Sequence, residues 1–353
     1  MKKLLLYLSL FLVAYITFSY NFKYFNGVSK NAQDGRFFNS FEESKPILDS
    51  KTKTGGKSVN KWLLNRNKTK VEWTEDDIKK FAKFDIYTKK DYSKGLEIIF
   101  INHASFLIQI EGVNIITDPI WSERSSPVSF FGPKRFINPP FKITELPKID
   151  YVLISHSHFD HLDLPTLKTL KTLFNPVFIG GLGTCKFLLR NGIKNCIQKD
   201  WGEKVEVKKN FNIFFEKAKH WSKRSLFDTN KILWGSFVIA SNKYKVYFAG
   251  DTGYGKHFQI IGDEYNGFDV ALLPIGAYKP QYIMKYSHIN PYEAALAHKD
   301  LKAKLSLGMH LKTFQLTDEG FNDPIIKLKV AKNNLNLKKQ EFKVLNFGER
   351  YIL

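Results

Sequence analysis

The sequence predicts an α/β protein, a four-layer αββα sandwich in which two sheets pack face to face and helices cover their outer faces. Three short runs rich in β-branched residues, at 96–102, 105–111 and 113–119, are separated by one or two residues, which is typical of an antiparallel meander. Further along the chain, strand-like runs alternate with helix-like ones, as in layered α/β folds. Hydrophobic residues make up 43% of the 353, as in an ordinary globular protein.

The later elements follow this alternation. Apolar runs predict strands at 150–155, 211–218, 235–241, 245–250, 269–275 and 304–309. Amphipathic stretches predict helices at 164–173, 182–191 and 290–298, the last with Pro291 in its first turn. Hairpins first and mixed strands and helices afterwards indicate two sheets with helices outside.

The first residues, 1–20, are predicted to be an N-terminal membrane anchor or signal segment. An uncharged apolar run at 4–20 follows Lys2 and Lys3, which is the layout of an exported or tethered chain. The run is not followed by a small-residue cleavage site, which favours an uncleaved anchor. We therefore expect a membrane-anchored or exported protein, with its folded domain on the non-cytoplasmic side, in the periplasm or cell envelope of a bacterium.

The rest of the chain divides into two parts. Residues 21–92 are polar and are predicted to be a linker and N-terminal extension, with GGK at 55–57 and one helix-like stretch near 75–84. Residues 93–353 contain all the predicted strands and are expected to form one domain, which carries the candidate functional residues.

Charge is strongly unbalanced. Lys and Arg number 54 against 34 Asp and Glu, a formal net charge of +20. Such an excess favours an anionic partner, such as a phospholipid headgroup, a phosphorylated substrate or a nucleic acid. Scattered, solvated Lys residues on exposed faces explain it almost as well.

The two cysteines, Cys185 and Cys196, flank a helix-like segment and lack the Cys-x-x-Cys spacing of a zinc or redox site. A disulfide between them would need an oxidising compartment. Two buried free thiols are the expected state.

The decisive segment is LISHSHFDHLDL, which follows a strand-like run. It places His156, His158, Asp160 and His161 within six residues. In a tight turn leaving a strand, the first two could face one metal and the last two a second metal beside it. Imidazole and carboxylate are the ligands that zinc and similar divalent metals prefer.

Three further ligand-type residues each come first after an apolar strand: His220, Asp251 and His310. Residues that follow the strands of two packed sheets can lie together at one edge of the sheets. We expect His220 to complete the first metal site, His310 to complete the second, and Asp251 to bridge them. Taken alone, each residue could instead be a helix-capping Asp or a buried, hydrogen-bonded His. This explanation is less probable when all three residues are considered together.

The chain resembles the metallo-β-lactamase superfamily and, within it, the N-acyl-phosphatidylethanolamine-hydrolysing phospholipase D branch. The likeness lies between about 96 and 316, in HSHFDHLD, TDPIWSERSSP, FGPKRF, HWSKRSLFDTNKILWGSF, FAGDTGY, GAYKPQYIMKYSHINPYEA and MHLKTFQL. The first and fifth segments are shared across the superfamily, and the others are more specific to the branch.

This resemblance implies the metallo-β-lactamase fold over 93–353, two zinc ions, and hydrolysis of a lipid phosphodiester by a membrane-associated dimer. It implies seven metal ligands, which are the residues already singled out: His156, His158, Asp160, His161, His220, Asp251 and His310. It also places His288 beside the substrate and gives His103 and Asp118 supporting roles, with Asp118 orienting a ligand histidine.

The expected reaction is attack on a phosphodiester by water activated between two metals. Asp160 or Asp251 would accept its proton, and His288 or a metal-bound water would protonate the leaving alcohol. Four basic residues near the ligand segments could bind phosphate or a membrane surface: Lys134, Arg135, Lys223 and Arg224. It is equally possible that they are ordinary solvated surface residues. The alternative activity is that of a lactonase or other ester hydrolase with a soluble substrate. No nucleic-acid partner is expected, because the sequence shows no single-strand-binding module.

Overall fold

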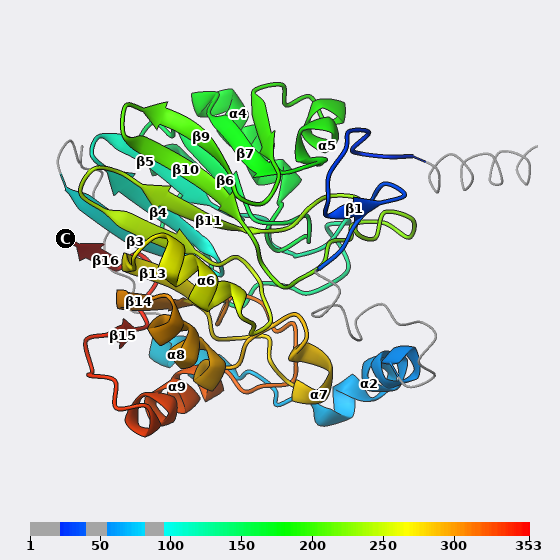
Figure 1. Ribbon diagram of the computed structural model, residues 1–353. Coiled ribbons are helices and arrows are strands. Elements are labelled where there is room, and N and C mark those ends of the chain that lie inside the picture. Colours follow the sequence, from blue (N-terminus) through cyan, green and yellow to red (C-terminus); the bar gives the residue numbers. More distant parts are fainter. Residues whose placement is uncertain (1–21, 40–54, 82–94) are drawn as a thin grey trace, which may run out of the picture.

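A computed structural model describes residues 22–39, 55–81 and 95–353. In this part of the chain, two seven-stranded sheets lie face to face, α4 and α5 cover one of them, and α6, α8 and α9 cover the other (Figure 1). The predicted four-layer αββα sandwich of the metallo-β-lactamase fold is confirmed.

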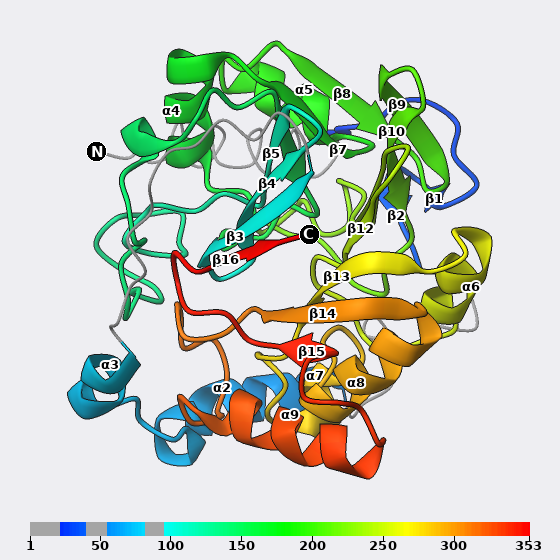
Figure 2. The same ribbon diagram turned by 90° about the vertical axis from the view of Figure 1, so that its left-hand side faces the viewer.

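The first sheet has the strand order β16-β3-β4-β5-β6-β7-β8. Its strands are β3 (Leu96–Asn102), β4 (Ser105–Ile110), β5 (Val113–Thr117), β6 (Tyr151–Ile154), β7 (Val177–Gly181), β8 (Cys196–Lys199) and β16 (Arg350–Ile352). The predicted meander forms β3 to β5, which pair antiparallel, and the strands from β5 to β8 are parallel. β16 pairs with β3 at the far edge, as Figure 2 shows.

The second sheet has the order β15-β14-β13-β12-β11-β10-β9. Its strands are β9 (Glu203–Lys208), β10 (Phe211–Glu216), β11 (Ser236–Ala240), β12 (Lys245–Phe248), β13 (Phe268–Pro274), β14 (Ala303–Met309) and β15 (Phe342–Lys343). The strands from β9 to β12 are antiparallel and those from β12 to β15 parallel. Like the first sheet, it therefore directs the carboxyl ends of its parallel strands to one edge, where ligand sites form in α/β proteins.

The outer helices are α4 (Leu164–Phe174), α5 (Thr184–Arg190), α6 (His257–Glu264), α8 (Pro291–Asp300) and α9 (Asp323–Asn334), with α7 (Gln281–Met284) and the 3-10 turn η1 (Ile143–Glu145) in loops. α8 begins as predicted. The Asn290 side chain accepts hydrogen bonds from the backbone of Tyr292 and Glu293, the Glu293 carboxylate accepts one from Asn290, and Pro291 stands in the first turn. This cap fixes the end of the loop that carries His288.

Apolar side chains fill two cores. The larger lies between the sheets and under α6, α8 and α9, with Phe100, Trp234 and Phe248 among its large buried side chains. The smaller lies between the first sheet and α4, and it includes Leu167 and Leu170 of that helix. Burial of this kind is the main stabilising contribution to such a fold. The two cores also hold the strand ends firmly in place.

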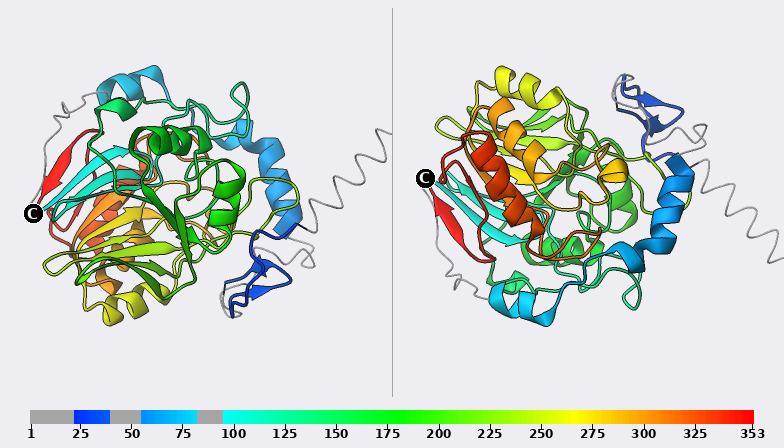
Figure 3. Two further views of the ribbon diagram at one scale, coloured as in Figure 1. Left: turned by 90° about the horizontal axis from the view of Figure 1, so that it is seen from above. Right: turned by 90° about the horizontal axis from the view of Figure 1, so that it is seen from below.

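The described parts of the N-terminal extension, 22–39 and 55–81, lie against this sandwich. The hairpin β1 (Ala32–Gln33) and β2 (Arg36–Phe37) places the Phe37 side chain fully inside the larger core. The GGK sequence at 55–57 is the first turn of α2 (Gly55–Thr69), which runs along the outer side of the molecule (Figure 3) and contacts α7. The helix expected near 75–84 is α3 (Glu75–Phe81).

Cys185 of α5 and Cys196 of β8 form a disulfide. The expectation of two free thiols is wrong, because the turn between α5 and β8 brings the two Cα atoms within 5.4 Å of each other. The bond ties the outer helix to the edge strand of the first sheet.

Among the described residues, no helix combines the length and apolar character needed to cross a bilayer. The apolar run at 4–20, on which the predicted anchor rests, lies outside the described residues.

Candidate metal centre

The HSHFDHLD segment forms a tight turn between β6 and α4, at the carboxyl end of a central parallel strand. The carbonyl of His158 accepts hydrogen bonds from the backbone of His161 and Leu162, at 3.2 and 2.8 Å. Such a turn points successive side chains inward rather than alternately to the two faces of a strand. His156, Asp160 and His161 are all buried there.

Three other turns at the same edge bring further ligand-type side chains to this one. His220 follows β10, Asp251 follows β12, and His310 follows β14 directly. His310 has a positive φ of 62°, an uncommon backbone conformation that turns its side chain back toward the site. The structure thus brings together all seven residues singled out in the sequence.

One group consists of His156, His158 and His220, whose candidate ligand atoms lie within 4.8 Å of one another. His220 Nε2 lies 3.2 Å from His158 Nδ1. Burial lowers the pKa of His158 to about 4 and lowers the pKa values of His156 and His220 well below the ordinary value. All three imidazoles are therefore neutral, the form in which histidine binds metal.

A second group consists of Asp160, His161 and His310, together with His103. The Nε2 atoms of His161 and His310 lie 3.4 and 3.5 Å from Asp160 Oδ2. His103, which lies in the turn between β3 and β4, places its Nε2 3.0 Å from the same oxygen. A hydrogen bond from His103 would therefore fix the orientation of the Asp160 carboxylate.

Asp251 lies between the two groups. Its Oδ2 is 3.2 Å from His161 Nε2 and 3.9 Å from His220 Nε2, and its Oδ1 is 3.2 Å from His310 Nε2. Burial opposes ionisation of this carboxyl, but His161 and His310 hold its pKa well below the ordinary value. A carboxylate in this position can serve both groups.

The donor set fits divalent metal ions. Several buried atoms of the two groups face one another without forming a hydrogen bond of good geometry within the described residues: Nε2 of His156, His158, His161 and His310, and Oδ1 of Asp251. Buried polar atoms without partners are costly, and a cation coordinated by them removes that cost. Burial favours a neutral His310, yet Asp251 and Asp160 outweigh it and raise the pKa of His310 to about 9. The centre therefore demands positive charge.

Partners behind the ligands fix which ring nitrogen faces inward. His161 Nδ1 lies 2.7 Å from Asp118 Oδ2, and His220 Nδ1 lies 2.8 Å from the carbonyl of Ser287. Asp118 is held in turn by the backbone N–H of Ser155 at 2.7 Å. Imidazoles that donate Nδ1–H in this way present Nε2 to a metal.

His288 lies at the side of the centre, between α7 and α8. Its Nδ1 is 3.7 Å from Asp251 Oδ2, and its side chain is 14% exposed, against 2% for that carboxylate. It groups with His220 and Asp251. His288 therefore lies beside the centre with its side chain partly open to solvent, where it could meet an entering ligand.

The two arginines of FGPKRF and HWSKRS behave differently from what the sequence suggests. Arg135 is buried, and its guanidinium donates to the carbonyls of Ser122 and Ile120 at 2.9 and 3.1 Å. The Arg224 guanidinium likewise binds main-chain carbonyls. Lys134 is exposed and pairs with Glu123. Neither arginine is a solvated surface residue.

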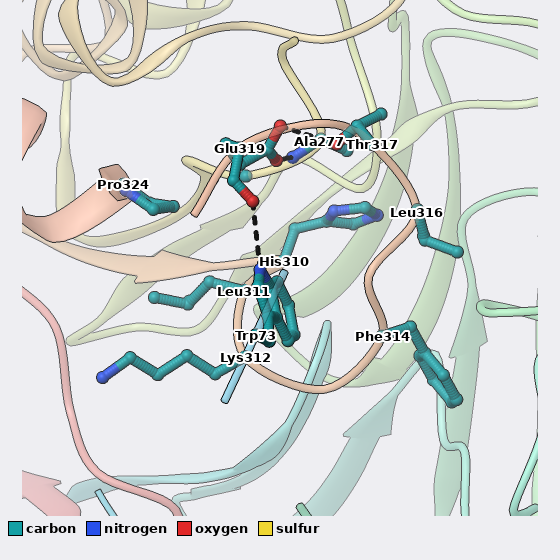
Figure 4. A pocket seen from close by; sticks show the side chains of 11 residues that line it. Trp73, Ala277, His310, Leu311, Lys312, Phe314, Leu316, Thr317, Glu319 and Pro324 are labelled. Carbon is teal, nitrogen blue, oxygen red and sulfur yellow. Dashed lines mark hydrogen bonds between the residues drawn. The ribbon is translucent and has the colours of Figure 1, made fainter. Parts of the chain in front are cut away.

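A pocket lies beside His310 (Figure 4). Its lining includes the apolar side chains of Trp73, Phe314 and Leu316. Glu319 holds the backbone that frames the pocket, because its carboxylate accepts hydrogen bonds from Ala277 N and Thr317 Oγ1. The indole of Trp73 donates to the Glu319 carbonyl. Sequence reasoning missed this frame, because Glu319 binds main-chain groups that only the fold brings near.

Comparison with known proteins places these observations in a family. The model of the Beta-lactamase superfamily domain matches residues 113–311, which include all seven candidate ligands. An N-acyl-phosphatidylethanolamine-hydrolyzing phospholipase D 1 of Caenorhabditis elegans is 38% identical over 268 residues, covering 72% of this chain and 75% of that protein. A mitochondrial N-acyl-phosphatidylethanolamine-hydrolyzing phospholipase D of Saccharomyces cerevisiae is 42% identical over 225 residues, covering 62% of this chain and 48% of the yeast protein.

Solved structures support the fold. A metallo hydrolase of the archaeon Ignicoccus hospitalis superposes with a TM-score of 0.57 at 23% identity, covering 74% of this chain and 99% of that one.

The localisation expected from the sequence, membrane-anchored or exported with the folded domain on the non-cytoplasmic side, is contradicted. The yeast relative is named as mitochondrial and not as exported. An N-terminal apolar run is a weak indicator of location, because anchors, signal segments and organelle-targeting segments can all begin in this way.

The resemblance drawn from the sequence motifs is confirmed by the family match, by the relatives and by the fold. The chain belongs to the metallo-β-lactamase superfamily, as a metal-dependent hydrolase that resembles the N-acyl-phosphatidylethanolamine-hydrolysing phospholipases D.

Proposed function

We propose that the chain is a binuclear zinc hydrolase, a phosphodiesterase of phospholipase D type that acts on N-acyl-phosphatidylethanolamine-like lipids. The proposal rests on one observation. The two groups of candidate ligands are buried, several of their ligand atoms have no hydrogen-bond partner within the described residues, and Asp251 lies between the groups. The names of the nematode and yeast relatives support the substrate class.

His156, His158 and His220 would hold one ion, Asp160, His161 and His310 the other, and Asp251 would contribute to both. Mixed imidazole and carboxylate ligands suit zinc. When bound, the ions would supply Lewis acidity, which lowers the pKa of water and offsets negative charge on a phosphate.

The carboxylates and His288 would move the protons. Asp160 and Asp251 are ionised, because the surrounding imidazoles hold their pKa values well below the ordinary range despite burial, so either can accept a proton from the attacking water. Burial lowers the pKa of His288 to about 4. His288 would therefore face the leaving oxygen as a neutral imidazole that donates a hydrogen bond, and the proton taken from water by the carboxylate would pass to that oxygen as the P–O bond breaks.

The substrate would be a phospholipid or another phosphodiester that meets the enzyme at a membrane surface, and the enzyme would act as a homodimer. The names of the nematode and yeast relatives favour a lipid phosphodiester over a sugar phosphate. Within the chain, we assign catalysis to residues 93–353, with 21–92 as an N-terminal extension to that domain.

The test uses the full chain with its metal content measured. Release of phosphatidic acid from an N-acyl-phosphatidylethanolamine in mixed micelles is compared with hydrolysis of a short, water-soluble analogue and of a soluble lactone. Faster turnover of the long-chain lipid is expected, with Asp251→Asn as the inactive control. If the lactone were the better substrate and micelles had no effect, the enzyme would be a lactonase of the same fold.

A further inference from the structure

Arg224, four residues after His220, reaches across to the turn that carries four of the seven candidate ligands. Its Nη1 lies 2.8 Å from the carbonyl of Ser157 and 2.8 Å from the carbonyl of Leu162. A third carbonyl, that of His158, lies at 3.5 Å. One nitrogen atom therefore joins two points five residues apart, on either side of Asp160 and His161.

Aromatic rings hold the guanidinium in this place. The centroid of the Phe159 ring lies 4.1 Å from Arg224 Cζ, and that of Phe187 in α5 lies 5.2 Å from it. A planar guanidinium stacks on such rings while its N–H groups stay free to donate at the edge. This contact accounts for the phenylalanine within HSHFDHLD, which is not a ligand type.

The backbone around Arg224 is itself fixed. The Asp228 carboxylate accepts hydrogen bonds from the backbone N–H groups of Arg224 and Ser225, at 3.0 and 2.7 Å. The same segment begins with His220 of the first group. Arg224 thus sets the separation between the His220 segment and the ligand turn, two pieces of chain that share one proposed metal site.

We propose that Arg224 is a positioning residue that closes the ligand turn and sets the metal affinity of the centre. The inference rests on the proposed metal centre. In this role Arg224 does not contact the substrate. Its position beside the ligands is explained by its hydrogen bonds to the ligand turn and does not require phosphate binding. Without its donors, two carbonyls of the turn lose their partner and the turn opens.

Arg135 offers a matched control. It also donates to main-chain carbonyls, and its Cζ lies 5.3 Å from the centroid of the Phe314 ring, but the carbonyls it binds belong to Ile120, Ser122 and Ile137, none of which neighbours a candidate ligand. The variants Arg224→Met and Arg135→Met remove the same chemistry from two places. Only the first should change metal binding.

The experiment measures zinc affinity by chelator competition and the thermal midpoint of the metal-free protein. We expect Arg224→Met to weaken zinc binding about 10- to 100-fold, the range found when partners of metal ligands are removed, with partial recovery in Arg224→Lys. Arg135→Met should lower the midpoint but leave zinc affinity within about threefold of wild type.

The inference is overturned if Arg224→Met binds zinc like wild type, or if Arg135→Met weakens it equally. Should Arg224→Met not fold, Phe159→Leu provides the second test, because it removes only the stacked ring and should weaken zinc binding in the same direction. Wild-type protein that binds no zinc would instead refute the metal centre. Wild-type protein that binds zinc but hydrolyses no lipid would refute only the proposed substrate.

Discussion

A methyl group added to Gly276 would overlap the carbonyl oxygen of His310. The backbone of the turn after β13 therefore touches the backbone of a candidate ligand, and only glycine fits between them. Gly276→Ala should destabilise the fold by about 1–3 kcal/mol, as overpacking does, and should displace His310. Urea unfolding measures the first effect and zinc titration the second.

Gly192→Ala is the control for this substitution. Gly192 has a positive φ of 85°, but a methyl group there would meet nothing within 4 Å. It should cost about 1 kcal/mol of stability through the backbone alone and leave zinc affinity unchanged. Equal effects of the two variants on zinc binding would show that contact with His310 is not the cause.

Asp118 should matter to the centre although it is not proposed as a ligand. Asp118→Asn keeps the shape of the side chain but replaces an oxygen that accepts from His161 Nδ1 or Ser155. We expect zinc binding about 10- to 100-fold weaker, since the preferred tautomer and orientation of His161 are lost. Unchanged affinity in equilibrium competition would contradict this role.

Replacing Asp251 and replacing His220 should remove different numbers of metal ions. Asp251→Ala should abolish stable binding of both ions, because its two oxygens lie near imidazoles of both groups. His220→Ala should mainly weaken the first site. Metal analysis after dialysis should therefore give about none and about one ion per chain, respectively. Equal and mild losses would argue against a shared carboxylate.

His298 in α8, away from the centre, should make stability depend on pH. It is buried beside Ser306 Oγ, and burial lowers its pKa from 6.5 to about 4. Between these values the unfolded chain binds the proton more strongly, so stability present above pH 6.5 is lost as the pH falls toward 4. From pH 7 to pH 5 the loss due to His298 is on the order of 2 kcal/mol.

The check is urea unfolding at pH 7 and pH 5. The decrease should be smaller by this amount in His298→Gln, whose side chain does not titrate. The same decrease in both proteins would place the pH dependence elsewhere, for example in the histidines of the centre.

Most of the layer architecture could be predicted from the sequence, because alternating apolar runs such as 96–102 and 105–111 report directly on half-buried strands. β8 was missed because its four residues are partly exposed and carry no clear alternation. α2 was missed because its first turn, GGK, has the composition of a linker, and because tertiary contacts of later residues stabilise the helix. One of these is the hydrogen bond from Trp62 to Asp318.

The candidate ligands could be found because each is a metal-binding side chain at the end of an apolar strand, as His310 is after β14. The same reasoning failed for Arg135 and Arg224. A basic residue near a site suggests a phosphate contact, whereas these two guanidinium groups bind backbone carbonyls, and nothing in the local sequence reveals those partners. Main-chain acceptors become visible only once the fold is known.

The pairing of β16 with β3 bears on how the protein is made. In the folded state the Arg350 guanidinium of β16 donates a hydrogen bond to the carboxylate of Glu97 in β3, 253 residues away in the chain. On the ribosome, β3 emerges with the apolar sequence LEIIFIN long before the strand that covers its edge. An uncovered apolar edge recruits other strands, so the nascent chain is open to aggregation throughout most of its synthesis. The first sheet is therefore completed only after translation of residue 350, and cellular yield should depend on chaperones that shield β3 until then.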